Sequence, residues 1–252
     1  MLHLAIECSG IAGSVALFDA DRQLDYRILP SHLSSIQSLA VTIRDVLHSA
    51  AVRQPQLISV THGPGSFTSL RVGLATAKML SLAWQIPIAG VDSLATIAQR
   101  ASEHNRPSPG WEPVIVTVIN AFRKQVFAAA WKDSLNGCCQ RLTPTQVIDA
   151  AEWCQQPLGS LQFNAALTSL PEAQGKHISV SGPGLLNYRP TETAGVSLVS
   201  EGLWMPRAID VARLGWLTFQ AGGAVGAADL QPVYVRASAA EEKAGPPPLP
   251  HS

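Results

Sequence analysis

The sequence predicts an α/β protein built from two related halves, each a mixed sheet flanked by helices. Strand-like segments joined by short turns open the chain, and a similar strand–turn–strand unit recurs after residue 113. Each unit is followed by alternating helix and strand patterns. A polar stretch with two prolines, residues 105–110, separates them. We therefore expect halves at residues 1–106 and 111–236 and a disordered, proline-rich tail at 237–252.

The first half begins with three strand patterns, at residues 2–7, 14–18 and 23–28, separated by turn-forming residues. Their short spacing predicts an antiparallel meander. Apolar residues recur three and four apart from about residue 34 to 51, which predicts an amphipathic helix capped by Ser34 or Ser35. Strands at 57–61 and 86–91, and a helix from 93 to about 101, complete this half.

The second half repeats the pattern with different spacing. Strands are predicted at residues 114–119 and 124–131 around a polar turn at 120–123. Thr143 and Pro144 are typical of a helix start, which predicts a helix to about residue 154. Further strands are expected near 178–181 and 196–199. The last predicted helix, 209–220, ends at two glycines.

A glycine-rich turn and an apolar helix follow the strand at 57–61. Gly63 and Gly65 favour a turn with positive φ, Pro64 stiffens it, and Thr68 or Ser69 is expected to cap the helix. The helix is apolar on more than one face, so it is either enclosed by its own chain or meets another protein. The turn has no lysine and no phosphate-loop spacing, which disfavours a nucleotide cradle.

Composition limits the classes of function. The formal net charge is zero, and 46% of the residues are hydrophobic. Such a chain can form a packed core, but it lacks the basic excess of a protein that binds nucleic acid alone. The N-terminus has no basic segment typical of a secretory signal, and the longest apolar stretch, 72–91, is interrupted by polar residues and proline. We expect a cytoplasmic protein without a membrane span.

Neither a metal site nor a covalent nucleophile is indicated by the residue spacing. No two of the seven histidines are four apart, and the cysteines Cys8, Cys138, Cys139 and Cys154 form no C-x-x-C pair, so free thiols are expected. Ser66 does not lie in a G-x-S-x-G sequence. No metal and no cofactor are therefore expected.

One segment carries a resemblance to a known family. The sequence Gly63-Pro64-Gly65-Ser66-Phe67-Thr68, followed by Leu-Arg-Val-Gly at 70–73, resembles the signature of the TsaB (YeaZ) family. Residues 4–9, 87–94, 120–127 and 232–236 resemble further family segments in the same order, so the likeness covers nearly all of residues 1–236. The chain departs from the family pattern at Glu7, Cys8, Ser69, Asn120 and Phe122.

The resemblance implies a fold of the actin/Hsp70/sugar-kinase (ribonuclease H-like) type. It also implies a non-catalytic scaffold subunit for synthesis of threonylcarbamoyladenosine in tRNA. Such a subunit binds a catalytic TsaD-type protein, which modifies the adenosine next to the anticodon. A TsaC-type adenylate synthase and a TsaE-type ATPase act in the same pathway. The resemblance further implies a homodimer in isolation and only indirect contact with tRNA.

On this interpretation the apolar helix supplies the surface for the partner. Gly73 and Ala77 form a row of small residues that another helix can approach closely. The expected interface residues are Leu70, Arg71, Gly73, Leu74, Ala77 and Lys78, with Leu39 and Ile43 from the preceding helix. Gly63, Pro64, Gly65, Ser66, Phe67 and Thr68 form the structural loop before them. Gly73→Leu or Ala77→Arg is expected to abolish pairing and leave the fold intact.

Two other functions are considered. The runner-up is an ATP-dependent small-molecule kinase or ATPase of the same superfamily, with Glu7, Ser9 and Asn120 as candidate cofactor-binding residues lining the cleft between the halves. Binding of Mg-ATP by the isolated chain distinguishes this enzyme from a scaffold. A lone tRNA-binding module conflicts with the zero net charge.

Overall fold

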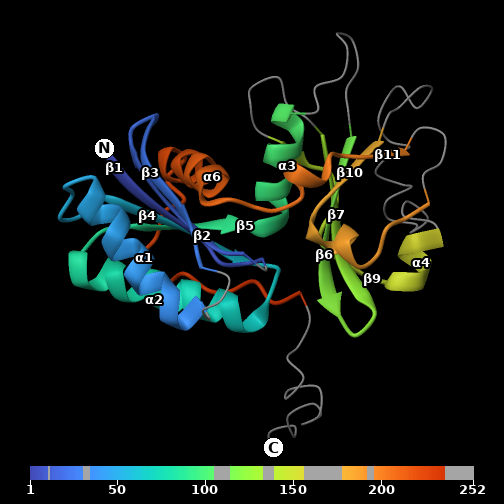
Figure 1. Cartoon of the computed structure of the whole chain (residues 1–252), viewed down its shortest axis with the longest axis horizontal. Coiled ribbons are helices and arrows are strands. Elements are labelled where there is room, and N and C mark those ends of the chain that lie inside the picture. Colours follow the sequence, from blue (N-terminus) through green and yellow to red (C-terminus); the bar gives the residue numbers. More distant parts are fainter. Residues whose placement is uncertain are drawn as a thin grey trace, which may run out of the picture.

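The computed structural model contains two sheets side by side, each accompanied by helices (Figure 1). It describes residues 1–10, 12–30, 35–104, 114–132, 139–155, 178–191 and 196–235. The predicted linker at 105–110, the tail at 237–252 and Cys138 lie outside the described residues. The predicted α/β class with two mixed sheets is confirmed.

The first sheet has the strand order β3-β2-β1-β4-β5. Its antiparallel meander comprises β1 (Leu2–Glu7), β2 (Ser14–Asp19) and β3 (Arg22–Ile28), as predicted. Two parallel strands, β4 (Leu57–Gly63) and β5 (Ile88–Asp92), extend the sheet from β1. The carboxyl ends of β1 and β4 therefore lie next to each other, which brings Glu7 near the glycine-rich turn.

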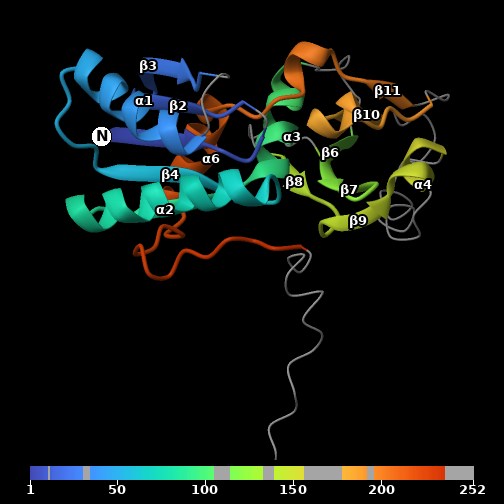
Figure 2. The same ribbon diagram turned by 60° about the horizontal axis from the view of Figure 1, so that its bottom comes forward.

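Helices cover both faces of this sheet (Figure 2). On one face, α1 (Ser35–Ser49) and α2 (Phe67–Trp84) pack over Leu4 and Ile6, which alternate along β1 with residues of the other face. On that other face, α6 (Ala208–Gln220) packs over Ala5 and its neighbours. All three helices were predicted, α1 from its apolar periodicity, α2 from the glycine-rich turn and apolar run that follow β4, and α6 as the helix that ends before two glycines.

The position of α6 was not predicted. It follows the second sheet in the sequence, yet it packs against β1, β2, β4 and β5 of the first. Gly215 makes this approach possible, because a Cβ there would overlap the side chain of Ser59 on β4. The helix belongs by packing to the half that the sequence boundaries give to residues 1–106.

The second sheet has the order β11-β10-β6-β7-β8. Its central hairpin consists of β6 (Val114–Phe122) and β7 (Gln125–Lys132), with β10 (Ile178–Ser181) parallel to β6. These strands were predicted. The remaining short elements are β8 (Gln140–Arg141), β11 (Val196–Leu198), and the 3₁₀ turns η1 (Pro183–Leu186) and η2 (Glu201–Leu203).

A helix was predicted from Thr143 to about residue 154, and this prediction is wrong for the first half of the segment. Residues Gln146–Asp149 instead form β9, which pairs with β7. The helix α4 (Ala150–Gln155) starts only after it, where Asp149 Oδ1 accepts the Ala151 N–H at 2.8 Å. The open edge of β7 is a long-range partner, and local helix signals do not reveal it.

One helix joins the two halves. α3 (Ser93–His104) follows β5, and its residues Leu94, Ile97 and Ala101 belong to a core shared with strands of the second sheet. Arg141 on β8 forms an ion pair with Asp92, the residue before α3. The halves are thus connected by both an apolar core and a polar contact.

Among the described residues, no helix has the length and apolar character needed to cross a membrane. The same part of the chain has no group of three or more His, Cys, Asp and Glu residues that could hold a metal ion. Cys8, Cys139 and Cys154 are free thiols.

Candidate functional site

The glycine-rich turn after β4 is held by the end of the described chain. Gly63 has a φ of 127°, as predicted, and a Cβ there would lie 2.6 Å from the Val233 carbonyl oxygen. The Val233 N–H donates to the His62 carbonyl at 2.8 Å. Gly65 does not have the predicted positive φ. Position 65 nevertheless requires a glycine, because a Cβ there would overlap the carbonyl oxygen of Ser9 in the neighbouring turn.

The start of α2 also differs from the prediction. The helix begins at Phe67 after the N-cap residue Ser66, so Thr68 and Ser69 lie within its first turn. Ser66 takes the extended conformation that ends the loop, and the Leu70 N–H donates to its carbonyl at 2.9 Å. The Ser66 and Ser69 hydroxyl groups are 3.1 Å apart and within hydrogen-bonding distance.

The predicted interface row on α2 faces the core of its own chain. Leu70, Leu74 and Ala77 are at most 4% exposed, and Gly73 is buried. Gly73 lies against Val60 of β4 and against Cys8, which directly follows β1. The small residues thus let the helix approach its own strands, and the expectation that this row faces a partner was wrong.

The same correction applies to the two residues expected from the preceding helix. Leu39 and Ile43 are 1% and 4% exposed and belong to the core between the sheet and α2. The clear periodicity of α1 marks the face that folds against the sheet. Only Arg71 and Lys78 of the eight expected interface residues are exposed or half-buried.

The free apolar surface lies on the opposite side of α2. Met79 and Leu82 are 70% and 68% exposed, and Ala75 precedes them on the same side at helical spacing. We call Ala75, Met79 and Leu82 the outer face of α2. It is the second apolar face that the sequence indicated, although the sequence did not distinguish it from the buried one. Leu82 also lines a hollow of about 540 Å³ with Ile86 and Pro87.

A ring cluster lies at the first turns of α2. The Arg71 guanidinium lies 4.0 Å from the centre of the Phe67 ring and donates from Nε to the Tyr234 hydroxyl at 3.1 Å. The Phe67 and Tyr234 ring centres are 5.4 Å apart. This contact fixes the end of the described chain beneath α2 (Figure 2). No sequence signal linked Tyr234 to a residue 163 positions earlier.

The proposed cofactor residues Glu7 and Ser9 are buried. Glu7 Oε1 accepts hydrogen bonds from the Ser9 N–H at 2.6 Å and the Ser9 hydroxyl at 2.5 Å. Burial raises the pKa of Glu7 to about 7, although hydrogen bonds from Ser9 and the Gly10 backbone act against this rise. A side chain with no exposed surface cannot line an open cleft.

Asn120 forms its side-chain hydrogen bonds with residues other than Glu7 and Ser9. Its Nδ2 donates to Asn187 Oδ1 at 2.9 Å, and its Oδ1 accepts the Phe122 N–H at 2.7 Å. Among the described residues, Asn120 and Glu7 share no hydrogen-bond partner. The structure does not assemble the three candidate cofactor residues into one polar site.

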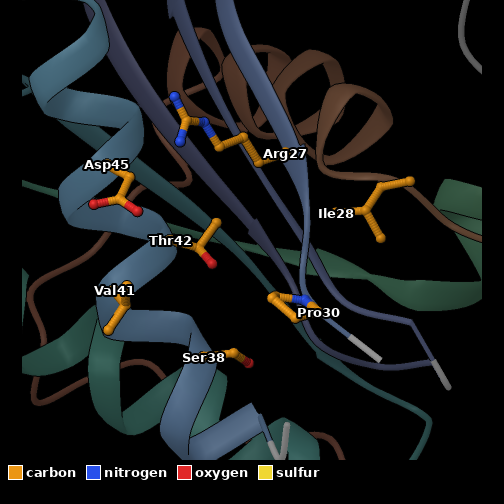
Figure 3. Close-up of a pocket in the computed structure, with 7 residues that line it drawn as sticks. All are labelled: Arg27, Ile28, Pro30, Ser38, Val41, Thr42 and Asp45. Atoms are coloured by element: carbon orange, nitrogen blue, oxygen red, sulfur yellow. The ribbon is translucent and has the colours of Figure 1, made fainter. Parts of the chain in front are cut away.

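A separate hollow of about 210 Å³ lies between β3 and α1 (Figure 3). Its lining comprises Arg27, Ile28, Pro30, Ser38, Val41, Thr42 and Asp45. None of these is a predicted site residue. The strand edge beside it is partly closed, because Asp25 Oδ1 accepts the Tyr26 N–H at 2.7 Å.

Comparison with known proteins gives one consistent family. Residues 28–212 match the family model described as TsaD, tRNA N6-adenosine threonylcarbamoyltransferase. The chain is 27% identical over 158 residues to the tRNA threonylcarbamoyladenosine biosynthesis protein TsaB of Bacillus subtilis, covering 62% of this chain and 65% of that protein. It is 25% identical over 247 residues to the protein of the same name from Escherichia coli, covering 96% and 98%.

Solved structures agree in fold. A Pseudomonas aeruginosa crystal structure described as an uncharacterized protein with similarity to peptidase YeaZ is 25% identical, with a TM-score of 0.71 over 93% of this chain and 99% of that one. The structure titled YeaZ from the same organism is 24% identical with a TM-score of 0.71 and the same coverage. The TsaD family model matches most of the chain, so the protein belongs to the TsaD family. Within this family, its relatives place it with the TsaB (YeaZ) proteins.

Proposed function

We propose that this chain is a non-catalytic scaffold subunit of the machinery that makes threonylcarbamoyladenosine in tRNA. In this role it binds a TsaD-type catalytic subunit and supports it. The observation that carries the proposal is the outer face of α2 in a chain of this family. Met79 and Leu82 are large, apolar and mostly exposed, and contiguous exposed apolar surface is typical of protein interaction sites.

The outer face suits a protein partner better than a small molecule. It is convex and helical, and Leu82 leads into the neighbouring hollow. The small side chain of Ala75 allows a second helix to approach α2 closely at its centre. A stable interface buries about 1,600 Å² in total, so α2 needs help from neighbouring elements such as the exposed side of α1.

The burial of the candidate cofactor residues Glu7 and Ser9 favours a scaffold over an ATP-dependent enzyme. Glu7, in the position of the family's acidic residue, is fully buried and directed at Ser9. The zero net charge supports indirect contact with tRNA. We place the chain in the cytoplasm, as a homodimer in isolation, in a pathway that includes a TsaC-type adenylate synthase and a TsaE-type ATPase.

The test is co-purification with the TsaD-type protein of the same organism. Met79→Asp and Leu82→Asp, singly and together, are expected to reduce recovery of the partner at least ten-fold, because they bury charge in an apolar contact. Leu186→Asp is the matched control, since Leu186 is 42% exposed but lies in η1, which packs against β6 of the second sheet. Recovery unchanged in the double variant, with the fold verified by thermal unfolding, refutes this docking surface.

Calorimetry with Mg-ATP tests the alternative function. The scaffold proposal expects no binding by the isolated chain at micromolar affinity. Micromolar binding that is lost in Glu7→Gln favours the kinase or ATPase instead.

A further inference from the structure

Glu7 is buried, and only one of its two carboxyl oxygens accepts hydrogen bonds from the described residues. Oε1 accepts both hydrogen bonds from Ser9, whereas Oε2 is buried and has no hydrogen-bond partner among the described residues. An ionised carboxylate can accept about four hydrogen bonds. The surroundings of Glu7 therefore suit a neutral carboxyl group better than a charged one.

The charged groups around Glu7 reinforce this preference. Asp210, in the first turn of α6, is 1% exposed, and its negative charge raises the pKa of Glu7 further. Arg207 donates two hydrogen bonds of 3.0 Å to Asp210 and holds that carboxylate in place. The Arg207–Asp210 pair interacts electrostatically with Arg100 on α3 and Tyr26 on β3. Directly after β1, burial raises the pKa of the Cys8 thiol, which stays neutral.

Glu7 lies where the first sheet touches the segment that joins the halves. A Cβ on Gly10 would lie 3.7 Å from Pro206, in the stretch between η2 and α6. The Ser14 hydroxyl at the start of β2 accepts the Ala208 N–H at 2.9 Å. Arg100 donates to the Met205 carbonyl in the same stretch. Figure 1 shows this stretch crossing from the second half to the first.

We propose that Glu7 is a proton-operated latch between the β1–β2 turn and the crossing segment at Met205–Asp210. With its proton, the carboxyl group holds Ser9 and Gly10 against Pro206 in a dry pocket. Without it, the unsatisfied charge faces Asp210, and the contact loosens so that water reaches Oε2. Acidification tightens the join between the halves, and alkaline conditions loosen it.

The sign and size of the effect follow from proton linkage. The pKa of a solvent-exposed glutamate is 4.5, and burial raises the pKa of Glu7 to about 7 in the closed form. The closed form therefore binds more protons between these values, and opening becomes easier as the pH rises through them. From pH 5 to pH 8 the opening constant is expected to rise roughly 70-fold and to level off above pH 7.

Hydrogen exchange of the full chain at several pH values from 5 to 8 tests the latch. Rates are divided by those of the urea-unfolded chain at the same pH, which removes the intrinsic pH dependence of exchange. Protection of the Ser9, Gly10 and Ala208 amides is expected to fall by the stated factor in the wild type and to stay within three-fold in Glu7→Gln. Glu152→Gln on α4, an exposed glutamate, is the matched control and should behave as the wild type.

Three results overturn the proposal. One is equal pH dependence in wild type and Glu7→Gln. Another is restored protection at pH 8 on adding Mg²⁺ alone, which indicates a cation site rather than a proton. If Glu7→Gln does not fold, carboxyl ¹³C NMR of the labelled wild type decides: a titration midpoint near 7 supports the latch, and one below 5.5 overturns it.

Discussion

Gly73 of α2 lies directly against Cys8, the residue that follows β1. A Cβ built on Gly73 would be 2.9 Å from the Cys8 Cβ and 3.3 Å from its sulfur. The missing side chain thus sets how closely α2 approaches the sheet. This relationship reverses the meaning that the sequence suggested for Gly73, from a contact with another protein to a contact within the core.

The first prediction follows from that contact. Gly73→Leu is expected to destabilise the chain by about 3 kcal/mol or to prevent folding, because several extra carbons must enter a filled space between α2 and β1. Urea unfolding measures the effect. Ala75→Leu is the matched control, since Ala75 is exposed on the same helix, and it should change stability by less than about 0.5 kcal/mol. Equal stability of the two variants contradicts the packing described for Gly73.

The second prediction concerns Asp92, which has two roles. Its Oδ1 caps α3 by accepting the Leu94 and Ala95 N–H groups at 2.7 and 3.1 Å, and its Oδ2 pairs with Arg141. Asp92→Ala removes the cap and the ion pair, whereas Arg141→Ala removes the pair and the stacking of Arg141 on Trp131. We expect a loss of about 2 kcal/mol for Asp92→Ala and about 1 kcal/mol for Arg141→Ala.

Thermal and urea unfolding of both variants give this comparison. Asn is a good cap without a charge, so Asp92→Asn is expected to resemble Arg141→Ala rather than Asp92→Ala. The reverse order, with Asp92→Asn as damaging as Asp92→Ala, means that the ion pair and not the cap dominates.

The third prediction uses two buried groups with opposite pH effects. Burial lowers the pKa of His3 to about 4, and its Nε2 lies 2.7 Å from the Ser59 hydroxyl. The unfolded chain binds a proton at His3 below about pH 6.5, so His3 makes stability fall as the pH drops toward 4. Glu7, whose pKa is raised to about 7, makes stability rise over the same interval.

Removing one of the two groups should therefore leave the pH dependence of stability that the other group causes. Relative to the wild type, Glu7→Gln is expected to lose about 2 kcal/mol more between pH 7 and pH 5, and His3→Gln about 2 kcal/mol less. Urea unfolding at pH 5, 6 and 7 measures both slopes. The double variant serves as the control and should recover the wild-type slope. Parallel slopes in all four proteins contradict the neutral state of these two side chains.

Local patterns of the sequence determined most of the secondary structure. Turn residues placed β1, β2 and β3, the apolar periodicity of α1 placed that helix, and two glycines marked the end of α6, each within a few residues. The positive φ at Gly63 followed from residue type alone. These features depend on neighbours along the chain, which a sequence displays directly.

The structure alone decided which partner each apolar face meets. α2 has two apolar faces, and the one with small residues was buried by a sheet whose distance from the helix no local signal encodes. Likewise, β9 formed a strand because β7 offered an open edge, and α6 returned to the first sheet because Gly215 fits over Ser59. The charge state of Glu7 depends on water being excluded by elements two hundred residues away. Sequence thus determined what each segment can form, and long-range packing decided which surface remained free for another protein.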